Sequence, residues 1–294
     1  VETEATIGLA LRKEAEKNNA IVTVADGDEP VAALDLYNFA RELSFDVISI
    51  GKGKNNPFDT FATPSSLTKE ASLKQMNPKM LTSFVDGTKT MVEMAALANF
   101  LGFNIDIDGM HGIEATYENI NQFYIPKKDG GLWDESQVVD FAVGIAPGVF
   151  AVIYSEDDYV NYEMEYLKMG KGPYWTLARP YHLTSLEIPR TIRHIMLEKY
   201  SKLSAQSWNV EVVAHAKQDI EPGTNLGSIG GDYIYGKAQK TSSSKGLLPI
   251  GIAEDNVVTK AIAKGNPIAI DEVDAQDNEL CEYWDYQNQI LDSD

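Results

Sequence analysis

The sequence lacks the features of secreted and membrane-spanning proteins. Its 294 residues include a single cysteine, Cys281, so no internal disulfide can form. No run approaches the roughly 18 consecutive apolar residues of a membrane-spanning helix. The sequence also does not open on a basic segment followed by an apolar one, as a signal peptide does. We therefore expect a cytoplasmic protein.

Several well-known catalytic motifs are missing as well. The sequence contains no GxGxxG, Walker A, CxxC, HExxH or GxSxG motif. GSIGG at 227–231 is not followed by a helical pattern, so we interpret it as a turn between strands and not as a phosphate-binding loop. The four histidines are far apart, and no two of them have the spacing of metal ligands on a helix. These absences exclude the usual zinc enzymes and serine hydrolases.

Basic residues are scarce, with 25 Lys and Arg against 44 Asp and Glu and a net charge of −19. Such a surface repels nucleic acids and anionic membranes, so we expect neither as a partner. Solubility alone would account for the charge. If the ligand is a small anion, the few cations must gather around it, and clustered lysines are then the residues to consider.

Hydrophobic periodicity predicts helices and strands in alternation up to about residue 205. The expected helices lie at 4–18, 30–43, 83–102, 156–168 and 184–199, and the expected strands at 20–26, 46–50, within 138–155 (two strands) and at 174–183. Residues 56–82 have the composition of a long functional loop with short helical pieces. A domain of this kind rarely opens on a helix that leads into a central strand, so we expect the sequence to begin partway through a parallel α/β domain.

From Trp208 onward the pattern is typical of short β-strands. Two phrases resemble each other, AKQDIEPGTNL at 216–226 and TKAIAKGNPIAIDEV at 259–273, which indicates a weak internal repeat in a small β domain. The tail that starts at Cys281 is either a docking helix or a frayed end.

The helix that follows DGTK, residues 86–89, carries the main catalytic candidates. Asp86 is placed to cap it, and Lys89 and Glu93 have the i, i+4 spacing of an ion pair. A capped surface helix with one ion pair would explain this pattern. The alternative is that the three side chains share one side of the helix. A lysine held between two carboxylates stays protonated and oriented, and it can stabilise an alkoxide or donate to a carbonyl during hydride transfer.

Three further segments contain cations that suit an anionic substrate. GKGK at 51–54 follows a predicted strand, and we expect a glycine loop whose lysines and N–H groups approach an anion. GMHG at 109–112 holds a histidine between glycines, and RPYH at 179–182 follows another predicted strand. A solvated loop, an exposed turn and a structural arginine are the respective alternatives. The substrate-binding candidates are Lys52, Lys54, Thr88, His111, Arg179 and His182.

Together these segments resemble a known family, the homoserine dehydrogenase-like NAD(P)-dependent oxidoreductases with a C-terminal SAF domain. The phrases that carry the resemblance span nearly the whole sequence: VETEA at the start, GDEP at 27–30, GKGK, MNPKMLTSFVDGTKTMVEMAALAN at 76–99, GMHG, ARPYHL at 178–183, AKQDIEPGTNL and LLPIGIA. The resemblance implies an α/β plus α+β fold. The end of a dinucleotide-binding Rossmann domain would occupy 1–30, an α+β catalytic and dimerisation domain 31–205, and a SAF-like β-clip domain 206–294.

The resemblance also implies roles for individual residues. Lys89 would donate the proton or stabilise the oxyanion, Asp86 would orient it and Glu93 would help to position the pair. The cofactor, NADP or NAD, would lie near Glu2, Gly27 and Asp28. The family pattern spaces the aspartate and lysine by four residues, whereas they are three apart here, so the resemblance does not specify homoserine as the substrate. By analogy we expect a homodimer or homotetramer.

Three functions follow from these observations. The first is an NAD(P)-dependent oxidoreductase that acts on a small anionic hydroxy or keto compound, such as a sugar phosphate or sugar acid. The second is an enzyme similar to 1-deoxy-D-xylulose 5-phosphate reductoisomerase of isoprenoid synthesis, with a divalent cation held by oxygen ligands such as Asp86, Glu93 or Asp108. The third is a binding or regulatory module without activity of its own.

Overall fold

The computed structural model describes residues 1–134, 136–274 and 278–292. Within them the chain forms two compact units, which we call unit 1 and unit 2. Unit 1 comprises residues 1–22, 56–102 and 204–294, and unit 2 comprises residues 23–55 and 103–203. This division differs from the three consecutive domains expected from the sequence, whose roles stay predictions. No described helix has both the length and the apolar composition needed to span a membrane.

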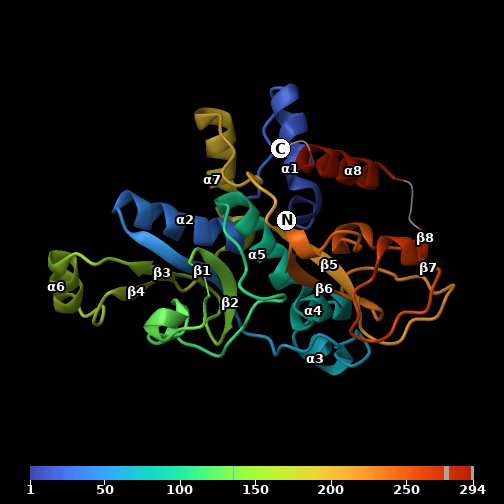
Figure 1. The fold of residues 1–294 in the computed structure, drawn as a ribbon, viewed down its shortest axis with the longest axis horizontal. Coiled ribbons are helices and arrows are strands. Elements are labelled where there is room, and N and C mark those ends of the chain that lie inside the picture. The colour runs from blue at the N-terminus through green and yellow to red at the C-terminus, as the bar shows by residue number, and fades with distance from the viewer. Residues whose placement is uncertain (135, 275–277, 293–294) are drawn as a thin grey trace. The chain divides into compact units, whose positions relative to one another are not determined.

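Unit 2 is built on a mixed four-stranded sheet in the order β2-β1-β3-β4 (Figure 1). The strands are β1 (Asp46–Lys54), β2 (Val138–Val143), β3 (Val149–Tyr154) and β4 (Tyr174–Arg179). β1 runs parallel to β2 and antiparallel to β3, which pairs in turn with β4. The two strands predicted within 138–155 are confirmed, although β1 lies between them. The mixed α/β class is confirmed too.

The helices of unit 2 begin with α2 (Glu29–Glu42), which packs against β1 and β3. The others are the short 3-10 turns η1 (Ile120–Gln122) and η2 (Lys127–Asp129), α6 (Asp158–Tyr166), η3 (Thr184–Glu187), α7 (Ile188–Arg193) and the π-turn η4 (His194–Glu198). The helices predicted from Pro30 and within 156–168 are confirmed. The single helix predicted at 184–199 is instead three short consecutive segments, η3, α7 and η4.

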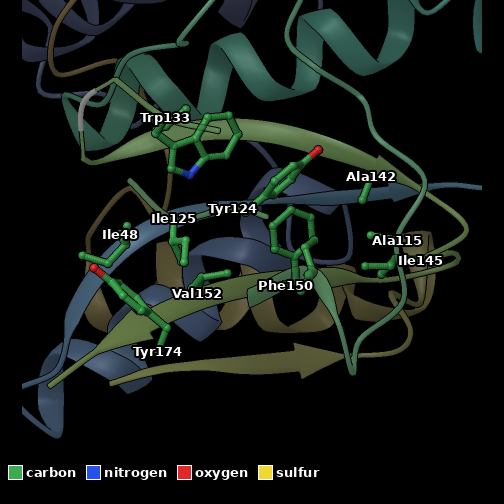
Figure 2. Packing of buried hydrophobic residues seen from close by; sticks show 12 residues of the cluster. Ile48, Ala115, Tyr124, Ile125, Trp133, Ala142, Ile145, Phe150, Val152 and Tyr174 are labelled. Carbon is green, nitrogen blue, oxygen red and sulfur yellow. The ribbon is translucent and has the colours of Figure 1, made fainter. Parts of the chain in front are cut away.

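Aromatic rings from an irregular segment fill the core of unit 2 (Figure 2). The ring of Tyr124 lies 4.6 Å from that of Trp133 and 5.6 Å from that of Phe150 on β3, centroid to centroid. All three side chains are fully buried. Burying an aromatic side chain contributes on the order of 2–3 kcal/mol, so this cluster helps to hold residues 103–133 on the sheet although η1 and η2 are the helical turns assigned there.

The GKGK segment is a strand and not the loop that we predicted. β1 continues through Lys54, and its last four residues are buried. A Cβ atom at Gly51 would collide with the carbonyl oxygen of Asp140, and one at Gly53 with that of Ile145. The glycines therefore allow the backbone of β1 to approach its neighbours closely, and they do not form an anion cradle.

The strand predicted at 20–26 is also wrong. Residues 20–25 have no regular secondary structure. Val24 donates a single backbone hydrogen bond to the carbonyl of Leu203, and the Thr23 hydroxyl accepts from the N–H groups of Lys202 and Leu203. An apolar run forms a strand only when a neighbouring strand satisfies its backbone hydrogen bonds. Here the contacts with Lys202 and Leu203 take the place of that strand.

Unit 1 combines helices with short antiparallel strand pairs. Its helices are α1 (Glu4–Lys17), α3 (Thr68–Leu73), α4 (Pro78–Val85), α5 (Thr88–Leu101) and α8 (Glu279–Leu291), and its 3-10 turns are η5 (Thr241–Ser243), η6 (Ile250–Ile252) and η7 (Ile270–Glu272). The strands are β5 (Val210–Ala216), β6 (Ile234–Lys240), β7 (Val257–Val258) and β8 (Val273–Asp274), with β5 paired to β6 and β7 to β8. The short helical pieces predicted within 56–82 and the β pattern after Trp208 are confirmed.

The two similar phrases of the sequence lie side by side. Ile220 and Ile262 exchange backbone hydrogen bonds, and Asn225 forms a bridge with Val257. The assignment of this region to a SAF-like β-clip stays a prediction.

Helices α1 and α8 lie against each other (Figure 1), and a buried glutamine side chain on α8 bonds to the backbone of α1. The backbone of α1 is not helical at Ile7, so the regular hydrogen-bond ladder breaks there. The amide of Gln287 fills the break: its oxygen accepts from the N–H groups of Leu9 and Ala10, and its NH₂ donates to the carbonyl of Thr6. The tail is therefore a docking helix, one of the two predicted alternatives.

Candidate active site

The DGTK turn joins α4 to α5. α4 ends at Val85, and Gly87, with φ at 87°, is the residue that precedes α5. A side chain at Gly87 would be strained at this φ and would also strike the ring of Phe58. Asp86 is thus not the N-cap residue that we predicted. Its carboxylate nevertheless accepts a hydrogen bond of 2.8 Å from the N–H of Thr88 and so supports the start of α5.

The charged partner of Asp86 is Lys217, which lies just after β5. Their Nζ and Oδ2 atoms are 2.8 Å apart, and the two side chains are 1% and 0% exposed. The same ammonium donates to the carbonyl of Gly231. The expectation that Asp86 pairs with Lys89 was therefore wrong. A buried carboxylate needs a cation close to it, and a residue far along the sequence supplies that cation.

Lys89 is held between two other carboxylates. Its Nζ lies 3.1 Å from Glu2 Oε1 and 3.4 Å from Glu93 Oε1, which confirms the predicted i, i+4 pair. The Lys89 side chain is 23% exposed and that of Glu93 only 2%. Partial burial alone would raise the pKa of the Glu2 carboxyl, but the Lys89 ammonium lowers it below its usual value. The Lys89 ammonium thus lies between two acids and compensates their negative charge.

Helix α5 is buried on nearly every side, not on one face as its spacing predicted. Thr88 and every residue from Thr90 to Asn99 are buried. Close contact with β6 requires Gly236, where a Cβ would lie 3.0 Å from the Thr88 methyl group. The N–H of Gly236 donates a 2.8 Å hydrogen bond to the Thr88 hydroxyl, which is therefore engaged in packing the start of α5.

In unit 2, four of the predicted residues gather around Glu29 at the start of α2. Asp28 caps the helix with a 3.2 Å hydrogen bond from the N–H of Glu29. Lys52 Nζ lies 2.8 Å and His182 Nε2 3.3 Å from Glu29 Oε1, and His182 Nδ1 is 2.9 Å from the carbonyl oxygen of Gly27. Burial alone would raise the pKa of Glu29, but Lys52 and His182 lower it to about 2. An ionised carboxylate thus organises this cluster.

Arg179 contacts acids of its own unit. It pairs with Glu187 and with Asp35, 3.5 Å away, and its guanidinium stacks 4.9 Å from the ring centre of Tyr181. Arg190 pairs with the same two acids. These contacts match the structural arginine that was the alternative to an anion-binding role.

His111 is fixed by two aspartates. Its Nε2 lies 2.9 Å from Asp106 Oδ2, and its backbone N–H donates to Asp140. Burial raises the pKa of Asp140 to about 6, against the opposing effect of the backbone N–H donors of His111, Gly112 and Phe141. The GMHG segment is therefore held in place and is not a free turn. Asp108, a metal-ligand candidate just before this segment, is exposed. Lys54, a predicted substrate-binding residue, is buried.

Sequence reasoning missed Glu29, Asp140 and Lys217. Asp140 gave a signal, because a charged residue in the apolar run VVDFAV must find partners when the strand is buried. Lys217 gave none, since its partner is distant in sequence. The candidates are divided between the units: Glu2, Asp86, Thr88, Lys89 and Glu93 belong to unit 1, and Gly27, Asp28, Lys52, Lys54, His111, Arg179 and His182 to unit 2.

Comparison with protein families gives a match. The family model described as the catalytic domain of oxidoreductase DRL matches residues 27–188, more than half of the 294 residues. The matched range includes the DGTK turn, the Glu29 cluster and the GMHG segment. No curated protein matches the chain.

Proposed function

Because the chain belongs to the oxidoreductase DRL family and is thus an enzyme with oxidoreductase activity, we propose that it transfers a hydride between a nicotinamide cofactor and a small anionic substrate. The reacting group is a hydroxyl or a carbonyl, and a sugar phosphate or a sugar acid has the expected chemistry.

The observation that carries this proposal is the environment of Lys89. Its ammonium is only partly exposed and lies between the carboxylates of Glu2 and Glu93. When a carbonyl gains a hydride, negative charge develops on its oxygen. A fixed ammonium stabilises that charge and can deliver the proton that completes the alcohol. In the opposite direction the same group stabilises the alkoxide from which the hydride leaves.

Asp86 acts in this proposal by position and not by contact with Lys89. Its carboxylate binds the N–H of Thr88 and the ammonium of Lys217, so it fixes the turn from which Lys89 projects. Glu93, nearly fully buried one helical turn further on, fixes the direction of the lysine side chain. We assign proton transfer to Lys89 and positioning to Asp86 and Glu93.

The Glu29 cluster of unit 2, taken by itself, is our proposed anion-binding site. Lys52 and His182 both offer N–H donors there, and both contact the carboxylate of Glu29. A small phosphate or carboxylate would compete with Glu29 for these donors, and the N-terminus of α2 favours negative charge. His111, held by Asp106 and Asp140, is a further candidate for substrate contact.

The nicotinamide cofactor would supply or accept the hydride. The described residues include no strand, glycine-rich turn and helix in succession of the kind that binds the pyrophosphate of a dinucleotide. Asp28 caps α2, and Glu2 pairs with Lys89. We therefore assign no step to the cofactor and restrict the mechanism to proton handling by this chain.

A nucleotide titration followed by a substrate screen tests the proposal. We expect NADPH or NADH fluorescence to change saturably when the protein is added. Reduced nucleotide should then be oxidised in the presence of a phosphorylated or carboxylated keto compound. Absence of any nucleotide binding would contradict the nicotinamide assignment. Loss of activity with EDTA would favour the reductoisomerase alternative over a simple dehydrogenase.

Replacement of the lysine tests its role. Lys89→Met should lower turnover by about 10²–10⁴-fold, the usual contribution of a positioned proton donor, and leave the circular dichroism spectrum unchanged. Lys69→Met is the matched control, because Lys69 is an exposed lysine on α3. Equal turnover of the two variants would remove Lys89 from the mechanism.

A further inference from the structure

Unit 1 contains a cavity of about 440 Å³ that the proposed reaction does not use. Trp208, Trp284 and Glu211 line it, together with Thr241, Ser244 and Asn288 among other residues. The volume lies within the range of about 300–1,000 Å³ that is usual for small-molecule pockets. The cavity thus combines two aromatic walls with a single deeply buried acid.

Glu211 lies on β5 and is 6% exposed. Its Oε2 accepts a 3.0 Å hydrogen bond from Trp208 Nε1, and its Oε1 accepts a 3.2 Å bond from the N–H of Val212. The side chain of Trp284 on α8 donates to the same carboxyl. Each of these groups donates a hydrogen bond to a carboxyl oxygen, so each of them would also stabilise the ionised form of Glu211.

The Glu211 carboxyl has no positively charged partner among the residues that the structure describes. Among the described residues, no Lys, Arg or His lies within 4.0 Å of the Glu211 oxygens, which is the limit for an ion pair. The other charged residues that line the cavity are Lys245 and Asp292, and both are exposed. Asp86, another deeply buried acid of unit 1, is paired with Lys217. A buried carboxylate without a cation is costly unless something completes it.

We propose that this cavity binds a small organic ammonium ion, whose charge pairs with the carboxylate of Glu211 and faces the indole rings of Trp208 and Trp284. Tryptophan is the best aromatic partner for such a cation. An ionised carboxylate can accept about four hydrogen bonds, and Trp208, Val212 and Trp284 already donate to this one. About one acceptor position is left, and a single ammonium N–H can use it. A quaternary ammonium has no N–H and would interact through its charge alone. The ligand is therefore a monocation and not a metal ion, which would need several oxygen ligands.

The ionisation of Glu211 gives the proposal a second signature. Burial raises the pKa of its carboxyl to about 8, although the hydrogen bonds from Trp208, Val212 and Trp284 oppose this effect. At pH 7 the carboxyl therefore holds a proton, and a bound cation would displace it. Ligand binding should release close to one proton, and the affinity should rise as the pH increases from 7 towards 9.

Calorimetric titration with choline is the test. The matched probe is its uncharged isostere, in which a quaternary carbon replaces the nitrogen. We expect choline to bind and the isostere to bind at least tenfold more weakly. Titration in two buffers of different ionisation enthalpy should show the released proton.

Two variants keep the outcome decisive. Glu211→Gln preserves the shape of the acid and removes its charge, so choline affinity should fall at least tenfold while the protein stays folded. Trp284→Leu should weaken choline binding too. Equal binding of choline and its isostere would overturn the proposal. The proposal would also be overturned if choline did not bind, if a neutral sugar bound better than choline, or if Glu211→Gln left the choline affinity unchanged. Neither probe is a substrate or a nucleotide, so these results are independent of the proposed reaction.

Discussion

Two buried acids of unit 1, Asp86 and Glu211, are stabilised in different ways. Asp86 has both a backbone N–H donor and the ammonium of Lys217 at 2.8 Å. Glu211 has N–H donors from two indole rings and from the backbone, but no cation within ion-pair distance among the described residues. The first arrangement is complete and fixes a turn of the chain. The second stays protonated at neutral pH, so it can respond to a ligand or to a change of pH.

Removal of the charge of Asp86 should have the largest effect on stability. Asp86→Asn leaves the Lys217 ammonium buried without its counterion, and the loss should be about 3–5 kcal/mol of the free energy of unfolding. Urea denaturation measures it. The double variant Asp86→Asn/Lys217→Met should recover part of the loss. A loss below about 1 kcal/mol for the single variant would contradict the buried pair.

Replacement of Gln287 should weaken the contact between α1 and α8. Gln287→Leu leaves two N–H groups and one carbonyl of α1 buried without partners, each at a cost of about 1–3 kcal/mol, and partial rehydration should keep the total near 3 kcal/mol. Thermal unfolding would show a lower midpoint. Because α8 carries Trp284, the same change should also weaken choline binding. Gln289→Leu, at an exposed position of α8, is the control.

The charge of Glu211 should appear in the pH dependence of stability. Its pKa is raised from 4.5 to about 8 in the folded protein, so the folded state holds a proton that the unfolded state releases. The stabilisation is complete below pH 4.5 and is lost as the pH rises through 8, with a slope of at most about 1.4 kcal/mol per pH unit. Urea denaturation at several pH values should show this decline in the wild type. An identical slope in Glu211→Gln would contradict the assignment.

The smallest effect is expected at Glu2, whose side chain is 47% exposed. Glu2→Gln removes one partner of Lys89, but solvent screens this pair, so the free energy of unfolding should change by less than about 1 kcal/mol. Denaturation curves for the variant and the wild type should nearly overlap. A loss of several kcal/mol would place this pair in the same class as Asp86 and Lys217.

Local patterns in the sequence were enough to predict local structure. The i, i+4 spacing gave the pair of Lys89 and Glu93, and apolar periodicity gave α1, α2 and the strands at 138–155. Contacts between distant segments were not predictable. Lys217 reaches Asp86 from beyond β5, and the collisions that require Gly51 and Gly53 come from carbonyls later in the chain, so GKGK had the composition of a loop.

The contact between α1 and α8 has a consequence for synthesis. Gln287 lies 278 positions after Leu9, whose backbone N–H it binds. At about 5–20 residues per second, a ribosome needs roughly a quarter of a minute to a minute to make the intervening chain. During that interval the break in α1 has no amide to fill it. The segment therefore has to remain hydrated, or be shielded by other molecules of the cell, until α8 emerges.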